Sequence, residues 1–329
     1  MVKTVVIVAA ILLLAGAVLG YYLFRALPLK PRPAGLHCYD LENGSYVPLE
    51  APPQAFGIGL SYAGHIEETA STFDPNATPP VFRKDVRALA RTDETVHLPS
   101  KEALCEAADS LEPGLGERLQ SRYDQLSPLL DYEVEMGMVL LQDIDPQSLD
   151  DPSFVPHLGF FIANDLSART LAILGDGRPN THDYWGVSKS FAGFMPVGDR
   201  AWVPRDPRPD TIPCVVIESS VNGDVRQQQS TEDLIYTPRQ MIGFVHEKYP
   251  EASLQKGTMI LTGTPGGVAL STPRWLVRLS GLLGLSRFTK LDAKLDGDTE
   301  RFLKPGDKVL VRGKGLGKVV VRIAEPLET

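Results

Sequence analysis

The chain has 329 residues, of which 43% are hydrophobic, enough to bury the core of one large domain or of two smaller ones. The net charge of −8, without a long block of Lys or Arg, argues against a general nucleic-acid-binding role. Cys38, Cys105 and Cys214 are odd in number and far apart in the sequence. They fit neither a disulfide framework nor a zinc site, so we expect structural or incidental thiols.

The chain begins with an uncharged apolar run at residues 5–24. A helix of that length spans ~30 Å, the thickness of the hydrocarbon core of a bilayer. A cleaved signal peptide is the alternative, but its apolar part is usually only ~7–15 residues long. We therefore predict a retained single-pass transmembrane anchor over residues 1–27.

Basic residues predict the orientation of this anchor. Lys3 precedes the apolar run, whereas Arg25, Lys30 and Arg32 follow it. The positive-inside bias then places the rest of the chain on the cytoplasmic side of the membrane. Residues 28–54 are predicted to form a Pro-rich linker and a short N-terminal segment, and residues 55–329 the main domain.

Local signals predict several elements of the main domain. Residues 55–60 are expected to form a strand, and residues 102–131 a polar helix and loop with Ser100 as the N-cap. Asn222-Gly223 predicts a hairpin turn, and Ser230 the start of a helix. Residues 259–268 predict a buried strand that breaks into a Gly-rich turn where backbone N–H groups can approach a ligand.

The stretch from Asp131 to Leu140 contains two acidic residues two positions apart. Its apolar residues alternate with other residues, which predicts a half-buried strand. Residues two apart on a strand share a face, so Glu133 and Glu135 point into one space. Neighbouring carboxylates repel each other unless one is protonated or a cation lies between them. The alternative is that both belong to a solvated strand face.

A third carboxylate, Asp165, follows the apolar run at residues 160–163, where a second strand is expected to end. No Cys or His lies nearby at ligand spacing, and carboxylate oxygens favour hard cations. Glu133, Glu135 and Asp165 therefore predict a site for Mg²⁺ or Mn²⁺.

The order of motifs resembles the fumarylacetoacetate hydrolase family, in its C-terminal catalytic domain. The resemblance runs from about Gly57 to the C-terminus. The motifs are Gly59–His65, Glu133–Glu135, Asn164–Arg169, Lys189–Phe191, Thr262–Val268 and Leu303–Asp307. It implies a mainly β fold with some α, the mixed β-roll of this family. The apolar run at residues 5–24 adds one predicted transmembrane helix before it. The resemblance also implies a possible homodimer.

The resemblance assigns roles to individual residues. Glu133, Glu135 and Asp165 are expected to bind the metal ion, and His65, oriented by Glu68, to activate water. An i,i+3 spacing on a helix would put His65 and Glu68 on one face. Lys189 is expected to be catalytic, as a donor to the developing oxyanion. Thr264 and Arg169 are expected to bind substrate, although Arg169 could instead brace the metal-binding loop.

The implied activity is metal-dependent hydrolysis of a carbon–carbon bond in a small 1,3-dicarbonyl or acylpyruvate-type 2-oxo acid. The alternatives are a decarboxylase or isomerase that acts on a related 2-oxo acid through a metal-bound enolate, and a silent membrane-tethered domain that binds a metabolite. The chain departs from the family pattern at Ser61, Lys84-Asp85, Thr170 and Ala172. We therefore expect conserved chemistry in an altered substrate pocket.

Residues 273–290 form a Leu-rich, basic insertion relative to the family, with Trp275 and Phe288. This composition suits a helix that lies on an anionic membrane surface. The alternative is a helix that packs on the domain itself.

Overall fold

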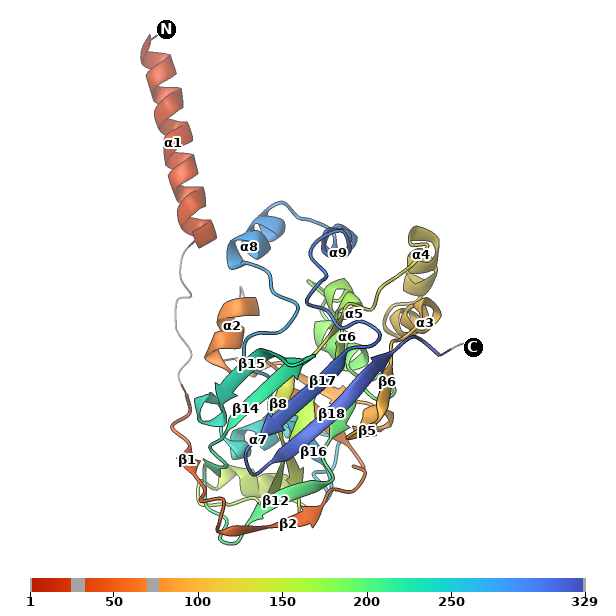
Figure 1. The fold of residues 1–329 in the computed structure, drawn as a ribbon. Helices are drawn as coiled ribbons and strands as arrows, with labels where there is room; N and C mark the ends of the chain where they lie inside the picture. The colour runs from red at the N-terminus through yellow and green to blue at the C-terminus, as the bar shows by residue number, and fades with distance from the viewer. Residues whose placement is uncertain (1, 25–32, 70–76, 328–329) are drawn as a thin grey trace.

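Two β-sheets packed face to face form the centre of the molecule, and most helices lie at one end of them (Figure 1). The computed structural model describes residues 2–24, 33–69 and 77–327. The larger sheet has nine strands, in the order β2-β12-β9-β8-β16-β3-β4, with β11 paired to β9 and β5 paired to β11. These strands are β2 (Gly44–Pro48), β3 (Ala55–Ile58), β4 (Val81–Lys84), β5 (Leu89–Arg91), β8 (Val134–Leu140), β9 (Leu158–Asn164), β11 (Met195–Val197), β12 (Arg200–Pro204) and β16 (Met259–Leu261).

The smaller sheet has five strands in the order β15-β14-β17-β18-β6. They are β6 (Thr95–His97), β14 (Val216–Val221), β15 (Asp224–Ser230), β17 (Lys308–Gly313) and β18 (Gly317–Ala324). β14 and β17 contact β8, and β17 and β18 contact β9. Every residue of β8 is consequently buried, so the prediction of a half-buried strand is wrong.

Two further strand pairs join distant segments: β1 (His37–Cys38) with β13 (Thr211–Ile212), and β7 (Leu130–Asp131) with β10 (Ser167–Ala168). β2 pairs with β12, so residues 44–48 belong to the same sheet as strands of the predicted main domain. The division into anchor, linker and main domain, with boundaries after residues 27 and 54, remains a prediction.

The helices make the described chain a mixed α/β structure, richer in helix than the mainly β fold that we predicted. They are α1 (Val2–Phe24), α2 (Ala63–Thr69), α3 (Lys101–Leu111), α4 (Leu115–Arg122), α5 (Arg169–Leu174), α6 (Thr181–Ser188), α7 (Pro238–Lys248), α8 (Arg274–Leu282) and α9 (Arg287–Leu295). Short 3₁₀ helices lie at Val86–Ala88, Pro146–Asp150 and Thr231–Asp233.

Two local signals in the sequence, the cap at Ser100 and the turn at Asn222-Gly223, are confirmed. Ser100 caps α3, its Oγ accepting a hydrogen bond from Ala103 N at 3.2 Å. Asn222 and Gly223 connect β14 to β15, both with positive φ, as a tight hairpin requires. The helix start predicted at Ser230 is a short 3₁₀ turn.

The N-terminal helix α1 extends away from the sheets and meets α8 at its C-terminal end (Figure 1). Phe24 stacks on Trp275 with ring centroids 6.2 Å apart, and Arg278 Nη1 donates to the carbonyl oxygens of Tyr22 and Leu23 at 3.1 and 3.2 Å. No helix in the described part of the chain is long and apolar enough to cross a membrane. The predicted span at residues 5–24 is therefore unsupported. The side chains of residues 1–12, and residues 25–32 at the predicted junction of anchor and linker, lie outside the described part.

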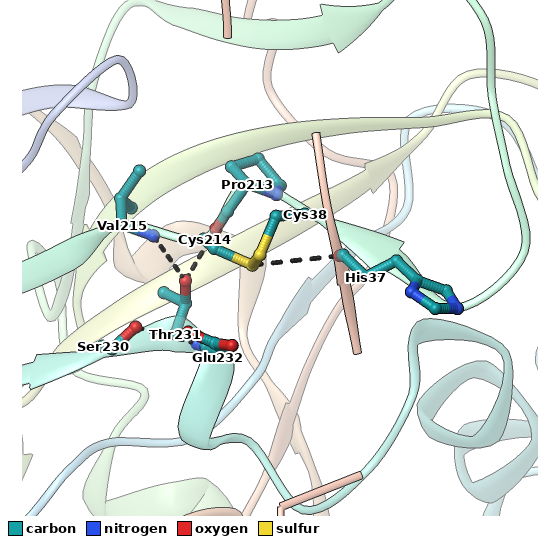
Figure 2. Close-up of a disulfide and its surroundings, with 8 residues drawn as sticks. All are labelled: His37, Cys38, Pro213, Cys214, Val215, Ser230, Thr231 and Glu232. Carbon is teal, nitrogen blue, oxygen red and sulfur yellow. Dashed lines mark hydrogen bonds between the residues drawn. A yellow bond between two sulfur atoms is a disulfide. The ribbon is translucent and has the colours of Figure 1, made fainter. Parts of the chain in front are cut away.

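A disulfide joins Cys38 to Cys214, so our expectation of unpaired cysteines is wrong for these two (Figure 2). β1 runs parallel to β13 with Cys38 opposite Ile212, and this register brings the two cysteine Cα atoms to 5.2 Å across a separation of 176 residues. Thr231 braces the segment: its Oγ1 accepts from Val215 N at 2.9 Å and donates to Pro213 O at 2.6 Å. Cys105 is a buried free thiol.

Candidate active site

Three carboxylates from two neighbouring strands converge at one point. β8 and β9 are antiparallel, with Glu135 opposite Ala163, and Asp165 N donates to Glu133 O at 2.8 Å just beyond the ladder. Asp165 therefore faces Glu133 across the pair, and Glu135 shares the face of Glu133 because it lies two residues further along the strand. Oxygen atoms of all three lie within 4.8 Å of one another, and the three side chains are buried. The predicted acidic cluster is confirmed.

Three cationic side chains surround this cluster. Lys189, at the C-cap of α6, donates through Nζ to Glu133 Oε2 and Asp165 Oδ2, both at 2.7 Å. Lys84, the last residue of β4, donates to Asp165 Oδ1 and to Lys189 O. Arg169 donates to Glu133 Oε1. Each acidic oxygen of Glu133 and Asp165 thus has a cationic partner.

Arg169 is held in place by a fourth buried acid. Its Nε donates to Asp131 Oδ2 at 2.8 Å. Asp131 also accepts from Ala269 N at 2.7 Å and from Leu270 N at 3.0 Å. Asp131 therefore connects the acidic cluster to the chain that leads into α8.

The neighbouring charges shift the pKa values of the two glutamates in opposite directions. Burial, followed by the nearby Asp165 and Glu133, raises the pKa of Glu135 well above its usual range. Burial also raises the pKa of Glu133, but Lys189 and Arg169 outweigh it and the net pKa is lowered.

The two lysines respond differently to the same acids. Burial lowers the pKa of both. At Lys189 the charges of Asp165 and Glu133 outweigh burial and raise the pKa, whereas at Lys84 the pKa stays lowered because the attraction of Asp165 is insufficient and Lys189 repels it.

The donor set fits a divalent metal ion. The three candidate ligands offer only oxygen atoms, as Mg²⁺ and Mn²⁺ prefer. The raised pKa of Glu135 means that the residues present leave one negative charge poorly balanced, and a bound cation would balance it. Glu133, Glu135 and Asp165 can therefore hold the ion.

The Gly-rich turn after β16 closes one side of the cluster. Gly263 N donates to Glu135 Oε2 at 2.7 Å. Gly263 has φ +91°, and a Cβ there would approach Ile58 O to 2.7 Å, so this position requires glycine. Thr264 lies beside it, but its hydroxyl donates to Val134 O at 3.1 Å and accepts from Gln227 Nε2 at 2.7 Å.

His65 and Glu68 lie on one face of α2, as their spacing predicts. Nδ1 of His65 is 3.9 Å from Oε2 of Glu68, which also accepts from Gly267 N at 2.9 Å. Burial raises the pKa of Glu68, but the neighbouring His65 and the hydrogen bond from Gly267 N outweigh it and lower the pKa. Glu68 is therefore an ionised partner for the imidazole at neutral pH.

One cavity of about 990 Å³ connects these groups. Its lining includes the predicted site residues Thr264, His65, Glu133, Glu135, Arg169 and Lys189. Glu68 and Asp165 are not part of this lining, but each contacts a residue that is: Glu68 lies beside His65, and Asp165 accepts a hydrogen bond from Lys189. The structure thus brings all the predicted site residues together, while their roles stay predictions.

Sequence reasoning missed three residues of the centre. From the sequence, Lys84 stands only within a departure from the family pattern, and Asp131 and Gln227 carry no predicted role. Gln227 holds the Gly-rich turn against β8: its Oε1 accepts from Val134 N and its Nε2 donates to Thr264 Oγ1. Alternation places Lys84 on the same strand face as the apolar Phe82, but no local pattern shows that this face meets the acidic cluster.

Two relatives with assigned names match most or half of the chain. Oxaloacetate tautomerase Fahd2a, mitochondrial, of Rattus norvegicus is 26% identical over 224 residues, 68% of this chain and 59% of that protein. Oxaloacetate decarboxylase, mitochondrial, of Dictyostelium discoideum is 29% identical over 164 residues, 49% of this chain and 69% of that protein.

A solved structure shares the fold. Fumarylpyruvate hydrolase from Pseudomonas aeruginosa, in complex with Mn²⁺ and pyruvate, superimposes with a TM-score of 0.52 at 18% identity, covering 92% of this chain and 99% of that one. The family model for the fumarylacetoacetate (FAA) hydrolase C-terminal region matches residues 54–324, most of the sequence. The chain therefore belongs to the fumarylacetoacetate hydrolase family.

Proposed function

We propose that this protein is a divalent-metal-dependent hydrolase that cleaves a carbon–carbon bond in a 1,3-dicarbonyl or acylpyruvate-type 2-oxo acid. The observation that carries the proposal is the His65–Glu68 pair in the same cavity as the Glu133, Glu135 and Asp165 cluster. A general base for water next to a cation site is what such a hydrolysis needs.

His65 acts as the base in this proposal. Its Nδ1 lies 3.9 Å from Glu68 Oε2, so the Glu68 carboxylate favours a proton on Nδ1 and leaves Nε2 to accept a proton from water. The water oxygen bonds to the carbonyl carbon of the acyl group, and the bond from that carbon to the neighbouring methylene breaks. The electron pair passes to the methylene carbon, which takes back a proton from His65. The products are a carboxylic acid and a shorter 2-oxo acid.

Positive charge stabilises the departing fragment. Lys189 Nζ contacts both Glu133 and Asp165 and lines the cavity, so it can donate to a substrate oxygen that becomes negative. Arg169 keeps Glu133 oriented, and Thr264 presents the Gly-rich turn to the substrate. Glu133, Glu135 and Asp165 would hold a divalent ion, which would supply Lewis acidity when bound.

Decarboxylation or tautomerisation of a related 2-oxo acid is the second candidate. The relatives from rat and Dictyostelium are named for reactions of oxaloacetate, and such reactions also develop negative charge on a 2-oxo oxygen. They do not need an activated water, so the His65–Glu68 pair favours hydrolysis. A silent metabolite-binding domain is less favoured. Burying this many charged side chains costs stability, and catalysis gives a reason for that cost.

Product analysis tests the proposal. The metal-stripped protein would be given Mg²⁺ or Mn²⁺ and offered acylpyruvates and oxaloacetate, with products followed by NMR. We expect a carboxylic acid and pyruvate from acylpyruvates, and a loss of kcat of about 10²–10⁴-fold in His65→Gln. His97→Gln, outside the cavity, is the matched control. Carbon dioxide release from oxaloacetate, or enol–keto exchange alone, with acylpyruvates intact would contradict hydrolysis.

Location is a separate proposal. Membrane anchoring through residues 5–24 rests on the sequence, as does the cytoplasmic side for the main domain. The Cys38–Cys214 disulfide favours the other side, because disulfides persist in oxidising compartments and are rare in the cytosol. We therefore propose a main domain in an oxidising compartment.

Thiol labelling in intact cells, followed by carbonate extraction of membranes, tests both points. If only Cys105 reacts after denaturation, the disulfide is intact and the oxidising compartment is supported. If all three cysteines react, the disulfide is absent and the proposal is contradicted. Release of the chain by carbonate would contradict the anchor. The homodimer stays a prediction that light scattering would check.

A further inference from the structure

The cavity has a polar end and an apolar wall. The polar end holds Glu133, Glu135, Lys189 and His65. Apolar lining comes from α8, together with Ile173 from α5 and Trp185 from α6. A 2-oxo acid head group that reaches the carboxylate cluster would leave most of a cavity of about 990 Å³ unfilled, since such a volume takes a drug-sized ligand.

One face of α8 lines this cavity. Leu276, Val277, Leu279 and Ser280 recur at helical spacing along it, the C-cap Leu283 continues the same face, and all five contribute to the lining. Leu276 and Leu283 are 39% and 62% exposed, so two large apolar side chains of the lining remain in contact with water. An apolar ligand would remove them from water.

The rest of α8 is engaged elsewhere. Trp275 stacks on Phe24, and the buried Arg278 donates to carbonyl oxygens at the end of α1. These contacts with α1 fix which side of α8 faces the cavity. The apolar wall is therefore a positioned part of the site.

Cations on the same wall already have partners. Arg178 pairs with Glu112 at 3.2 Å, and Lys290 pairs with Asp176 at 2.5 Å. Lys294 Nζ donates to Ser271 O at 3.2 Å. A second carboxylate on the substrate would have to compete for these groups, whereas a hydrocarbon chain would not.

We propose that the substrate is a 2-oxo or acylpyruvate-type acid with a long hydrocarbon chain, whose head group lies at Lys189 and the carboxylate cluster and whose chain lies along Leu276 and Leu283. The proposal rests on the proposed function for the identity of the head group. It assigns α8 the role of selecting the chain.

Affinities of saturated 2-oxo acids test the cavity without turnover, because these acids contain no 1,3-dicarbonyl group to cleave. The full-length protein with Mn²⁺ would be titrated calorimetrically with 2-oxobutanoate, 2-oxooctanoate, 2-oxododecanoate and the dicarboxylate 2-oxoglutarate. We expect Kd to fall by about tenfold for every two buried methylenes. Equal affinities for all chain lengths, or tightest binding of 2-oxoglutarate, would overturn the proposal.

Two variants on α8 localise the effect. Leu276→Gln combined with Leu283→Gln should remove the dependence of Kd on chain length. Leu282→Gln, whose side chain is 58% exposed but outside the cavity lining, should keep it. If instead the double variant keeps the chain-length dependence but loses binding to anionic vesicles, α8 is a membrane-docking helix and the proposal fails.

The two proposals can fail separately. Chain-length-dependent binding without acylpyruvate cleavage would refute the proposed hydrolysis and leave the apolar wall established. Cleavage of acylpyruvates with the same kcat/KM for acetyl and decanoyl substrates would refute only the proposal that α8 selects a long hydrocarbon chain.

Discussion

Glu135 is the carboxylate of the centre with the least help from its neighbours. Glu133 and Asp165 each contact two cationic side chains, whereas Glu135 accepts a hydrogen bond from the backbone of Gly263. Its raised pKa follows from burial beside two other acids. A bound cation would offset the repulsion between Glu135 and the two neighbouring acids. Glu135 should therefore contribute strongly to metal affinity.

Replacing Glu135 by Gln removes one ligand charge while keeping the shape of the side chain. We expect the Kd for Mn²⁺ to rise by about 100-fold or more, beyond the effect typical of residues that only orient ligands. Isothermal titration calorimetry of the metal-stripped protein measures this. Glu117→Gln, on the exposed surface of α4, is the control, and an unchanged Kd in Glu135→Gln would place the ion elsewhere.

Lys84 makes a different prediction, for stability. It is buried and donates to Asp165 and to Lys189 O, so Lys84→Met leaves an acid and a carbonyl with one partner fewer. We expect the free energy of unfolding to fall by about 3–5 kcal/mol. Urea denaturation measures it, with Lys314→Met on the surface as the control. A loss below 1 kcal/mol would mean that Lys84 is not a structural part of the centre.

The acidic cluster was predictable from the sequence and Lys84 was not, for a physical reason. Glu133 and Glu135 share a strand face by alternation alone, and their partner Asp165 ends the next strand. Lys84 reaches the cluster from β4, 81 residues before Asp165 in the sequence. No local pattern encodes that contact; it depends on how the nine-stranded sheet is assembled.

At the level of elements, Glu112 connects the end of α3 to the helices around the cavity. It accepts from Arg287 of α9 and from Arg118 of α4, and Tyr184 of α6 donates to it at 3.2 Å. Burial raises the pKa of Glu112, but the hydrogen bonds from Arg287 and Arg118 outweigh it and lower the pKa to about 2. The ionised form is therefore the one that holds these helices together.

This lowered pKa gives a pH dependence with a defined sign. The stabilisation by Glu112 is complete above its unfolded-state pKa of about 4.3 and is lost as the pH falls towards about 2. The Tm of the native protein should exceed that of Glu112→Gln by a constant amount above pH 5, and the difference should shrink at lower pH. Differential scanning calorimetry from pH 7 to pH 3 measures both. If the difference in Tm between the native protein and Glu112→Gln grew as the pH fell, ionised Glu112 would not be the form that stabilises these helices.

The predicted single helix at residues 273–290 is two helices instead. Gly284 has φ +61°, and Ser286 caps α9, so the chain turns between α8 and α9. The sequence contains both the glycine and the capping serine, but its run of Leu residues favours one uninterrupted helix. The result matters for the site, because the turn lets α9 contact α5 while α8 lines the cavity.

At the level of the whole molecule, the packing of the two sheets was beyond the reach of local pattern. Alternation in β8 predicts one solvated face, but β14 and β17 cover it. The disulfide was missed for a related reason. Cys38 and Cys214 become neighbours only because β1 pairs with β13, and both strands are two residues long and carry almost no sequence signal.

The disulfide should contribute measurably to stability. Replacing Cys214 by Ser, or reducing the bond, is expected to lower the free energy of unfolding by about 2–4 kcal/mol, because the unfolded chain regains freedom. Guanidinium denaturation with and without reductant measures the change. Cys105→Ser removes a thiol that forms no bond and should retain the sensitivity to reductant. Equal stability in both redox states would argue that the bond does not form.

The bond between Cys38 and Cys214 also closes a covalent ring of chain. The ring contains His65, Lys84, the three clustered carboxylates and Lys189, whereas the Gly-rich turn at Thr264 lies outside it. A protease that cuts once anywhere between residues 39 and 213 therefore leaves two fragments that stay attached. Such a nicked molecule runs as one band on a non-reducing gel and as two after reduction, and its acidic centre remains tethered in one piece.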